Sequence, residues 1–442
     1  MLKFTVMFWE KTFTGGIHPD YSKELSSGKP IENAPLPRSV TIPLIMHTGA
    51  ICDPLVKPGD LVKAGQKIGE SSKYISAAVH ASISGTVKAI EPRLCFTGAL
   101  ALSVVIESDG KNEAIMPAIE PDVLKAIKEA GIVGMGGAAF PTHVKLSPPK
   151  DKPIEYLLIN GAECEPFLTC DHRIMLEETE LVLEGISLAA KLLKVEKVFI
   201  GIEGNKQDVI DNFKLQTSNF KTDHKLQIVK LETKYPQGGE KQLIKAITGR
   251  EVPSGGLPYE VGVVVLNVGT CAQIAKTLHT GMPLIERVVT VTGKYLKEPK
   301  NLRVKIGTSF KELIEFCGGV TQGEIKKVIS GGPMMGIAVP SLDVPVVKGT
   351  SGILVMIEEE ARLPEPEYCL RCGKCVDICP QYLLPNYLAD YSEKEKFEKC
   401  EKFGALDCIE CGACSYVCAS KRNLAQLIKL AKAEIIKQRI TK

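Results

Sequence analysis

The sequence predicts a multidomain chain of the α/β-plus-β class, in which a parallel sheet covered by helices is joined to smaller β units and a cysteine-rich helical end. Three observations predict it. The 442 residues allow roughly two to four domains of about 100–200 residues each. Helical and strand-like patterns alternate from about residue 122 to residue 285. Eight of the fifteen cysteines form two regularly spaced runs between Cys369 and Cys418.

Composition narrows the function classes. The 55 Lys and Arg residues nearly balance the 52 Asp and Glu residues, and the formal net charge is +3, so no strong attraction to nucleic acid is expected. No apolar run approaches the roughly 20 residues that a membrane-spanning helix needs. The first residues, MLKFTVMFWEK, show no secretory pattern, so we expect a cytosolic chain whose thiols stay reduced and whose clustered cysteines hold metal.

Two kinds of pattern precede the cysteine-rich end. Residues 39–112 contain short apolar runs separated by turn signals, as in SVTIPLIM, VKPGDLVKAGQKIGES and SISGTVKAIEP, which predict a small all-β unit. Further along, IEYLLIN, KVFIGIE, LQIVKLE and VGVVVLN are typical of buried strands, and segments with helical periodicity lie between them. Such alternation predicts a parallel sheet with helices on both faces.

The cysteine-rich end contains two runs with the same spacing, C-x2-C-x2-C-x3-C, which is typical of bacterial two-cluster ferredoxins. In that arrangement, three thiolates of one run and the fourth thiolate of the other run hold one [4Fe–4S] cluster. One predicted ligand set is Cys369, Cys372, Cys375 and Cys418, and the other is Cys408, Cys411, Cys414 and Cys379. Two clusters this close together would transfer single electrons between a donor and an acceptor.

A pair of zinc sites is the alternative interpretation of these runs. Zinc takes four ligands, usually from two separated pairs, and the 2-2-3 spacing fits that pattern poorly. Six further cysteines are expected to be ordinary side chains and not ligands: Cys52, Cys95, Cys170, Cys271, Cys317 and Cys400.

A glycine-rich stretch, GIVGMGGAAFPT, occupies residues 131–142. Backbone amides in such a loop can approach a phosphate or a flat ring, although a purely structural turn remains an alternative. The stretch is neither a Walker loop nor GxGxxG after a strand. Three further segments favour a ligand site, because in the predicted sheet they fall at the same edge: NGAECEP at 160–166, YPQGGE at 235–240 and NVGT at 267–270.

These segments carry a resemblance. GIVGMGGAAFPTHVKL, NGAECEP, the GGE turn and NVGT resemble the FMN- and NADH-binding domain of the complex I flavoprotein subunit. VKPGDLVKAGQKIGE with ISGTVKAI resembles a lipoyl-type barrel-sandwich hybrid, and VTVTGKYLKEPKNLRVKIG resembles an SLBB β-grasp element. With GGIHP near the N-terminus and the two-cluster end, the chain resembles the RnfC family of Rnf electron-transport complexes from about Phe13 to Arg422.

The resemblance implies a division of the chain into seven parts. They are an N-terminal arm (1–38), a barrel-sandwich hybrid without the lysine for a lipoyl group (39–112), a Rossmann-like FMN- and NADH-binding domain (113–285), an SLBB β-grasp (286–340), a β segment and linker (341–363), a two-[4Fe–4S] ferredoxin-like helical domain (364–420) and a C-terminal helix (421–442).

The resemblance also implies site residues. The FMN phosphate and ribityl chain would be surrounded by Gly134, Gly136, Gly137 and Lys145, and the flavin would be lined by Asn160, Glu163, Gly239, Glu240, Asn267 and Thr270. Phe140 and Glu165 would face the nicotinamide nucleotide. The chain departs from the complex I pattern at Met135, Ala162 and Cys164, where that pattern has Arg, Asp and Gly. Loss of the Asp removes a ribityl contact, so weak FMN binding is expected.

The implied function is that of a peripheral subunit at the cytoplasmic face of the cell membrane, touching the membrane through its partner subunits. NADH would pass a hydride to FMN without a catalytic side chain, and electrons would continue through the two clusters. The whole complex would couple electron transfer between ferredoxin and NAD to Na⁺ or H⁺ translocation. The alternatives are a cobalamin reductase, whose modules come in another order, and a non-catalytic electron-carrying adaptor with a vestigial Rossmann-like part.

Overall fold

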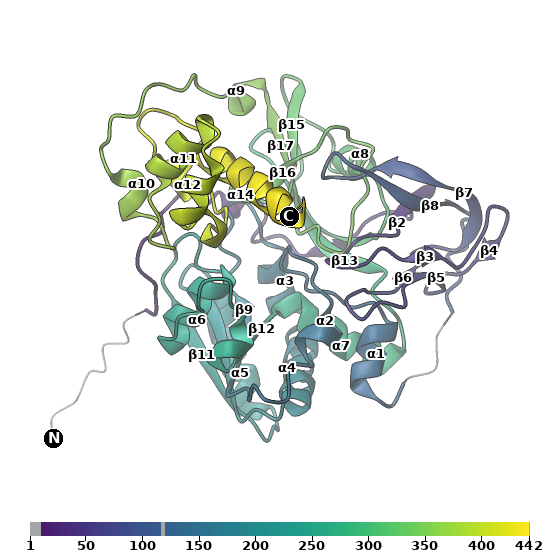
Figure 1. Ribbon diagram of the computed structural model, residues 1–442. Coiled ribbons are helices and arrows are strands. Elements are labelled where there is room, and N and C mark those ends of the chain that lie inside the picture. Colours follow the sequence, from purple (N-terminus) through teal and green to yellow (C-terminus); the bar gives the residue numbers. More distant parts are fainter. Residues whose placement is uncertain (1–9, 116–119, 442) are drawn as a thin grey trace.

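The computed structural model describes residues 10–115 and 120–441 (Figure 1). Its central domain contains a parallel four-stranded sheet in the order β11-β10-β9-β12. The strands are β9 (Tyr156–Gly161), β10 (Lys197–Glu203), β11 (Lys225–Leu231) and β12 (Val263–Asn267). All four strand predictions in this domain are confirmed. The strand order reverses between β9 and β12, so the carboxyl ends of these two strands form a switch point where open α/β sheets bind ligands.

Helices cover both faces of this sheet, as the alternating pattern predicted. On one face, Leu157 and Ile159 of β9 pack with Val182 and Ile186 of α4; on the other, Leu158 packs with helix α6. The helices of this domain are α1 (Val123–Glu129), α2 (Thr142–Lys145), α3 (Cys170–Glu177), α4 (Thr179–Leu193), α5 (Gln207–Asn219), α6 (Glu240–Thr248) and α7 (Val268–Thr280), with a short 3₁₀ helix at Pro258–Val261. Successive strand residues point to opposite faces, which explains the two separate apolar cores.

The preceding domain is all-β, as predicted. It has two sheets, in the orders β2-β8-β7-β4 and β3-β5-β6, around a core that includes Ile42, Ile68 and Ile106. Its strands are β2 (Ser39–Pro43), β3 (Asp53–Pro54), β4 (Leu61–Val62), β5 (Lys67–Glu70), β6 (Val79–His80), β7 (Gly85–Leu94) and β8 (Leu100–Ser108).

A mixed six-stranded sheet follows the central domain, in the order β1-β14-β13-β17-β15-β16. Its strands are β1 (Ile31–Asn33), β13 (Glu286–Thr292), β14 (Lys300–Lys305), β15 (Ile325–Ser330), β16 (Ile337–Ala338) and β17 (Gly352–Ile357), with helices α8 (Phe310–Phe316) and α9 (Glu358–Ala361). Strand β1 comes from the N-terminal arm and pairs in parallel with β14, and β17 comes from beyond residue 340. The sheet therefore unites strands from three of the predicted segments.

The cysteine-rich end is a small helical domain, coloured yellow-green to yellow in Figure 1. Its helices are α10 (Lys374–Asp377), α11 (Pro385–Glu393), α12 (Phe397–Lys402), α13 (Ala413–Tyr416) and α14 (Leu424–Thr441), with short 3₁₀ helices at Lys23–Leu25 in the arm and Ala405–Asp407 here. Helix α14 packs on the domain through Ile428, Ala431 and Ile435. No helix within the described residues combines the length and apolar character needed to cross a bilayer.

Candidate functional site

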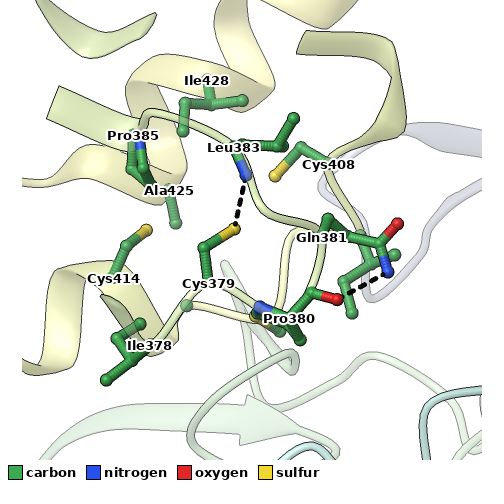
Figure 2. A pocket seen from close by; sticks show the side chains of 13 residues that line it. Ile378, Cys379, Pro380, Gln381, Leu383, Pro385, Cys408, Cys414, Ala425 and Ile428 are labelled. Atoms are coloured by element: carbon green, nitrogen blue, oxygen red, sulfur yellow. Dashed lines mark hydrogen bonds between the residues drawn. The ribbon is translucent and has the colours of Figure 1, made fainter. Parts of the chain in front are cut away.

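The structure brings the eight motif cysteines together in two groups of four. One cavity is lined by Cys379, Cys408, Cys411 and Cys414. We call these cysteines the proximal set, because Cys411 shares a buried core with Cys164 and Tyr235 of the central domain. Figure 2 shows the sulfurs of Cys379, Cys408 and Cys414 around this space, between Ile378, Leu383 and Ile428. A second cavity is lined by Cys369, Cys372, Cys375 and Cys418, which we call the distal set. These groups combine three cysteines of one run with the fourth of the other run.

The two cysteine runs have the same backbone conformation. Arg371 and Glu410 occupy equivalent positions and have φ values of 53° and 58°, and the equivalent Gly373 and Gly412 have φ values of 81° and 76°. Amides near the start of each run point at sulfur: Arg371 N lies 3.4 Å from Cys369 Sγ, and Glu410 N lies 3.4 Å from Cys408 Sγ. N–H groups aimed at thiolates are typical of iron–sulfur sites, where they tune the potential.

The spacing of the sulfurs separates the cluster and zinc interpretations. A tetrahedral zinc ion with Zn–S bonds of about 2.3 Å draws its sulfurs to within about 3.8 Å of one another. Among the described residues, three potential ligand atoms lie within 4.8 Å of one another at Glu163, Cys170 and Asp171, and in neither cysteine cavity. The wider separation of the cysteines favours a polynuclear cluster over a single ion.

Burial in the proximal cavity disfavours the free thiolate form of its cysteines. Burial and the neighbouring thiols raise the pKa of Cys411 to about 12, and burial raises the pKa of Cys414 as well. A thiolate at these positions therefore needs positive charge beside it, which coordinated iron supplies.

The glycine loop lies over the switch point of the parallel sheet. Met135 N donates to Thr270 Oγ1 at 2.9 Å, and a Cβ placed on Gly136 would lie 3.5 Å from Asn267 Cβ. Gly136 and Gly137 are exposed, and a Cβ on Gly137 would meet no described atom within 4 Å. The loop is therefore packed on one side and open on the other. The predicted residues Gly134, Gly136, Gly137, Asn267 and Thr270 come together here.

Three further predicted residues, Lys145, Glu240 and Asn160, lie at the same edge of the sheet. Lys145 Nζ lies 2.7 Å from Glu240 Oε1 and donates to the carbonyl of Val265 at 3.0 Å. Asn160 Nδ2 donates to the carbonyl of Gly238 at 2.8 Å. These contacts join β9 and β12 to the segment that opens α6, and that segment contains Gly239.

The acidic loop after β9 is held by buried lysines. Lys23 of the N-terminal arm donates to the carbonyls of Glu163, Glu165 and Leu168 at 2.6–2.9 Å, and Lys206 donates to the carbonyl of Ala162 at 2.6 Å. The Glu163 carboxylate accepts from the first amides of α3, those of Asp171 and His172. An acid at a helix N-terminus is stabilised by the helix dipole.

Two of the departures from the complex I pattern, Ala162 and Cys164, lie within this loop. Ala162 and Cys164 are both buried, and a Cβ placed on Gly238 would lie 3.5 Å from the Ala162 Cβ and 3.2 Å from the Cys164 Sγ. Close packing of the 235–240 loop on small side chains at 162 and 164 gives a structural reason for these residues. Met135 is buried against the barrel-sandwich core.

Glu165 lies at a junction of three domains. Its carboxylate accepts from the amides of Met334 and Met335 in the loop between β15 and β16, at 3.1 and 2.8 Å. Its Oε1 lies 3.5 Å from the hydroxyl of Tyr235, which donates to the carbonyl of Cys411 at 2.7 Å. Burial raises the pKa of Glu165 to about 7, although the two amides favour its charged form.

Sequence reasoning missed Lys23 and Tyr235. Neither has a neighbour pattern that marks it, because the contacts of both are with distant parts of the chain. The available signals were the paired glycine of GGIHP, which permits a close approach of backbones, and the position of Tyr235 at the start of YPQGGE.

Four family models match the chain in sequence. The RnfC barrel sandwich hybrid domain matches residues 11–111, the Nuo51 FMN-binding domain 127–276, the SLBB domain 288–338 and a 4Fe-4S dicluster domain 363–419. The chain therefore carries an FMN-binding domain and a domain for two [4Fe–4S] clusters.

A solved structure supports the fold. The chain is similar to a chain of the NAD⁺-reducing [NiFe]-hydrogenase in the air-oxidised state, with a TM-score of 0.51 at 19% identity. The match covers 72% of this chain and 64% of that one. At this identity the likeness concerns the arrangement of the elements.

Curated relatives match nearly the whole chain. A subunit of the Na⁺-translocating ferredoxin:NAD⁺ oxidoreductase complex of Acetobacterium woodii is 50% identical, over 97% of this chain and 98% of the relative. The corresponding subunit of the proton-translocating complex of Clostridium ljungdahlii is 48% identical, over 96% and 94%. That of the ion-translocating oxidoreductase complex of Rhodobacter capsulatus is 40% identical, over 95% and 82%. The chain belongs to the RnfC family, whose members are subunits of ion-translocating ferredoxin:NAD oxidoreductase complexes.

Proposed function

We propose that this chain is the NAD(H)-reacting subunit of a membrane-bound complex that couples electron transfer between ferredoxin and NAD to ion translocation. The observation that carries the proposal is the contact between the proximal cysteine set and the loops at the switch point of the FMN-binding domain. The chain would sit at the cytoplasmic face, and other subunits of the complex would be its partners and its link to the membrane.

The open face of the glycine loop fits the flavin. Gly134, Gly136, Gly137 and Lys145 would hold the FMN phosphate and ribityl chain, and Asn160, Glu163, Gly239, Glu240, Asn267 and Thr270 would line the ring system. Gln237, in the same loop as Gly239, is fully buried, and both atoms of its amide lack a hydrogen-bond partner among the described residues. An orphaned amide in the loop that carries Gly239 and Glu240 marks a polar group that the described residues leave unsatisfied near this edge.

The donor sets fit two clusters. Each cavity offers four cysteine sulfurs, which are the ligands that a [4Fe–4S] cluster takes. When bound, FMN exchanges a hydride with NADH and single electrons with the clusters. The proximal set adjoins the FMN-binding domain, and Cys372 of the distal set is exposed. We therefore assign the proximal set to the flavin side and the distal set to the partner side.

For the nicotinamide nucleotide, Phe140 is the better supported of the two predicted contacts. It lies on the glycine loop and is partly exposed. The carboxylate of Glu165 is already engaged by the amides of Met334 and Met335, which supports a role in joining domains.

The proposal is tested by anaerobic titration of the FMN-reconstituted chain with NADH, followed by flavin absorbance and the EPR signal of reduced clusters. Flavin bleaching followed by a cluster signal is expected. A Lys145→Met variant should bind FMN several-fold more weakly, because it loses a cation at the switch-point edge of the sheet, where Lys145 contacts Glu240 and Val265. The exposed Lys152→Met variant should match the parent chain. An iron-loaded chain that binds neither FMN nor NADH would favour the electron-carrying adaptor instead.

A further inference from the structure

We infer that Tyr235, with Gly15 and Gly16 of the N-terminal arm, positions the proximal cysteine set against the FMN-binding domain and so controls electron transfer between the flavin and that set. The inference rests on the proposed function. The transfer moves one electron from reduced flavin to the oxidised proximal cluster and breaks no bond in the protein.

Tyr235 is a direct bridge between the two domains. Its side chain is fully buried, and its hydroxyl donates to the carbonyl of Cys411 at 2.7 Å. It stands in the same loop as Gly238, Gly239 and Glu240, where the predicted flavin residues lie. One end of the loop therefore faces the flavin edge, and the other end is bonded to the backbone of a cysteine in the proximal set.

The N-terminal arm holds the same bridge from the side. Ile17 and Tyr235 exchange two backbone hydrogen bonds at 2.8 and 2.9 Å, and Gly16 N donates to the carbonyl of Ile378 at 2.8 Å. The arm is thus bonded to the FMN-binding domain on one side and to the first cysteine run on the other.

The backbones approach too closely here for any side chain. A Cβ on Gly15 would lie 2.9 Å from Ile378 O and 3.2 Å from the carbonyl carbon of Cys379, and a Cβ on Gly16 would lie 2.8 Å from Tyr235 O. Both glycines have φ of 85°, in the left-handed region that disfavours other residues. The GG pair of GGIHP therefore allows the arm to lie between the two domains.

The contact is apolar around its hydrogen bonds. Ile17, Cys164, Tyr235, Cys411 and Ala413 form one buried core, so segments from the arm, the FMN-binding domain and the proximal set share it. Met334 packs against this core, and a Cβ on Gly412 would lie 3.1 Å from its carbonyl oxygen. A packed contact of this kind fixes the distance between the proximal set and the FMN-binding domain. Electron tunnelling slows steeply as the distance between donor and acceptor grows.

The hydroxyl of Tyr235 is tested by Tyr235→Phe, which keeps the ring and removes one hydrogen bond. In rapid mixing of the FMN- and iron-loaded chain with NADH, flavin reduction should keep its rate, and electron arrival at the proximal cluster should slow by roughly three- to tenfold. Amide hydrogen exchange at residues 408–414 should rise. Tyr387→Phe is the matched control, because its ring stacks on Phe403 and its hydroxyl has no bond among the described residues.

The arm is tested by Gly16→Ala against Gly28→Ala. A Cβ on Gly28 has no described atom within 4 Å, so the control should behave as the parent chain. Gly16→Ala should bind FMN and keep full iron content, with slowed electron arrival and a shifted midpoint potential of the proximal cluster alone. Unchanged transfer, exchange and potential in both Tyr235→Phe and Gly16→Ala would overturn the inference. If NADH reduces neither cofactor in the parent chain, the proposed function fails instead.

Discussion

The two cysteine cavities share a motif and a backbone conformation but have different surroundings. In the proximal set, Cys379, Cys411 and Cys414 are buried, and the FMN-binding domain, the arm and the β15–β16 loop pack nearby. In the distal set, Cys375 is buried, Cys372 is exposed and the neighbouring Tyr368 and Leu370 are 96% and 68% exposed. The motif specifies how the four cysteines of each set are arranged, and the contacts around each set specify which neighbour it faces.

The largest difference should follow removal of one cysteine from each set. Cys411→Ala should lose roughly half of the iron and abolish cluster reduction by NADH, because the set beside the flavin is gone. Cys372→Ala should lose a similar share of iron yet keep NADH-dependent reduction of the remaining cluster. Iron analysis and EPR measure both effects. Equal electron arrival in the two variants would contradict the assignment of proximal and distal sets.

A Cys408/Cys411 double Ala variant checks the ligand sets themselves. It should also lose roughly half of the iron, since both residues belong to one set. Loss of nearly all iron would show that the two sets cannot form independently, and unchanged iron would remove the ligand assignment.

The N-terminal arm should affect the stability of the chain around the proximal set and leave the distal set unchanged. Lys23→Met leaves the carbonyls of Glu163, Glu165 and Leu168 without their shared donor, which should cost about 3 kcal/mol in the free energy of unfolding. Denaturant unfolding of the loaded chain measures the loss, with the exposed Lys11→Met as control. The EPR spectrum of the distal cluster should not change; a change there would mean that the arm also organises the distal side.

A pH effect should follow from Glu165 at the three-domain junction. Burial raises its pKa in the folded chain to about 7, above its value in the unfolded chain. Between about pH 4.5 and 7 the folded chain holds a proton that the unfolded chain has released, so the free energy of unfolding falls as pH rises through this range. In unfolding curves compared across pH, Glu165→Gln should reduce the fall in the free energy of unfolding between about pH 4.5 and 7 by about 2–3 kcal/mol. An unchanged slope would exclude this carboxyl as its source.

The smallest effect concerns iron removal. A soluble chelator should remove iron from the distal set several-fold faster than from the proximal set, because Cys372 is exposed and the proximal set is covered by neighbouring domains. EPR spectra taken during chelation can follow the two signals separately. Tyr235→Phe should make the two rates of iron loss more similar, because it loosens the packing of the neighbouring domains on the proximal set.

Much of this architecture was predictable from local pattern. The four strands of the parallel sheet followed from apolar runs, and the cysteine groups followed from spacing, since neighbours in sequence determine both. The arm was not predictable: residues 1–38 show no periodicity, yet they contribute β1 to a sheet and Lys23 to the acidic loop. Glu165 was expected at the nucleotide from the resemblance, and its contacts to Met334 and Met335 have no local signal.

The sequence by itself determined the order of domains, the class of the sheet and the two groups of cysteines, because periodicity and spacing act over a few residues. Only the tertiary structure decided which group lies against the FMN-binding domain. That choice depends on contacts such as the one between Tyr235 and Cys411, which are 176 positions apart in the chain. Such contacts depend on how whole domains pack, and for this reason the same cysteine motif lies in two different surroundings.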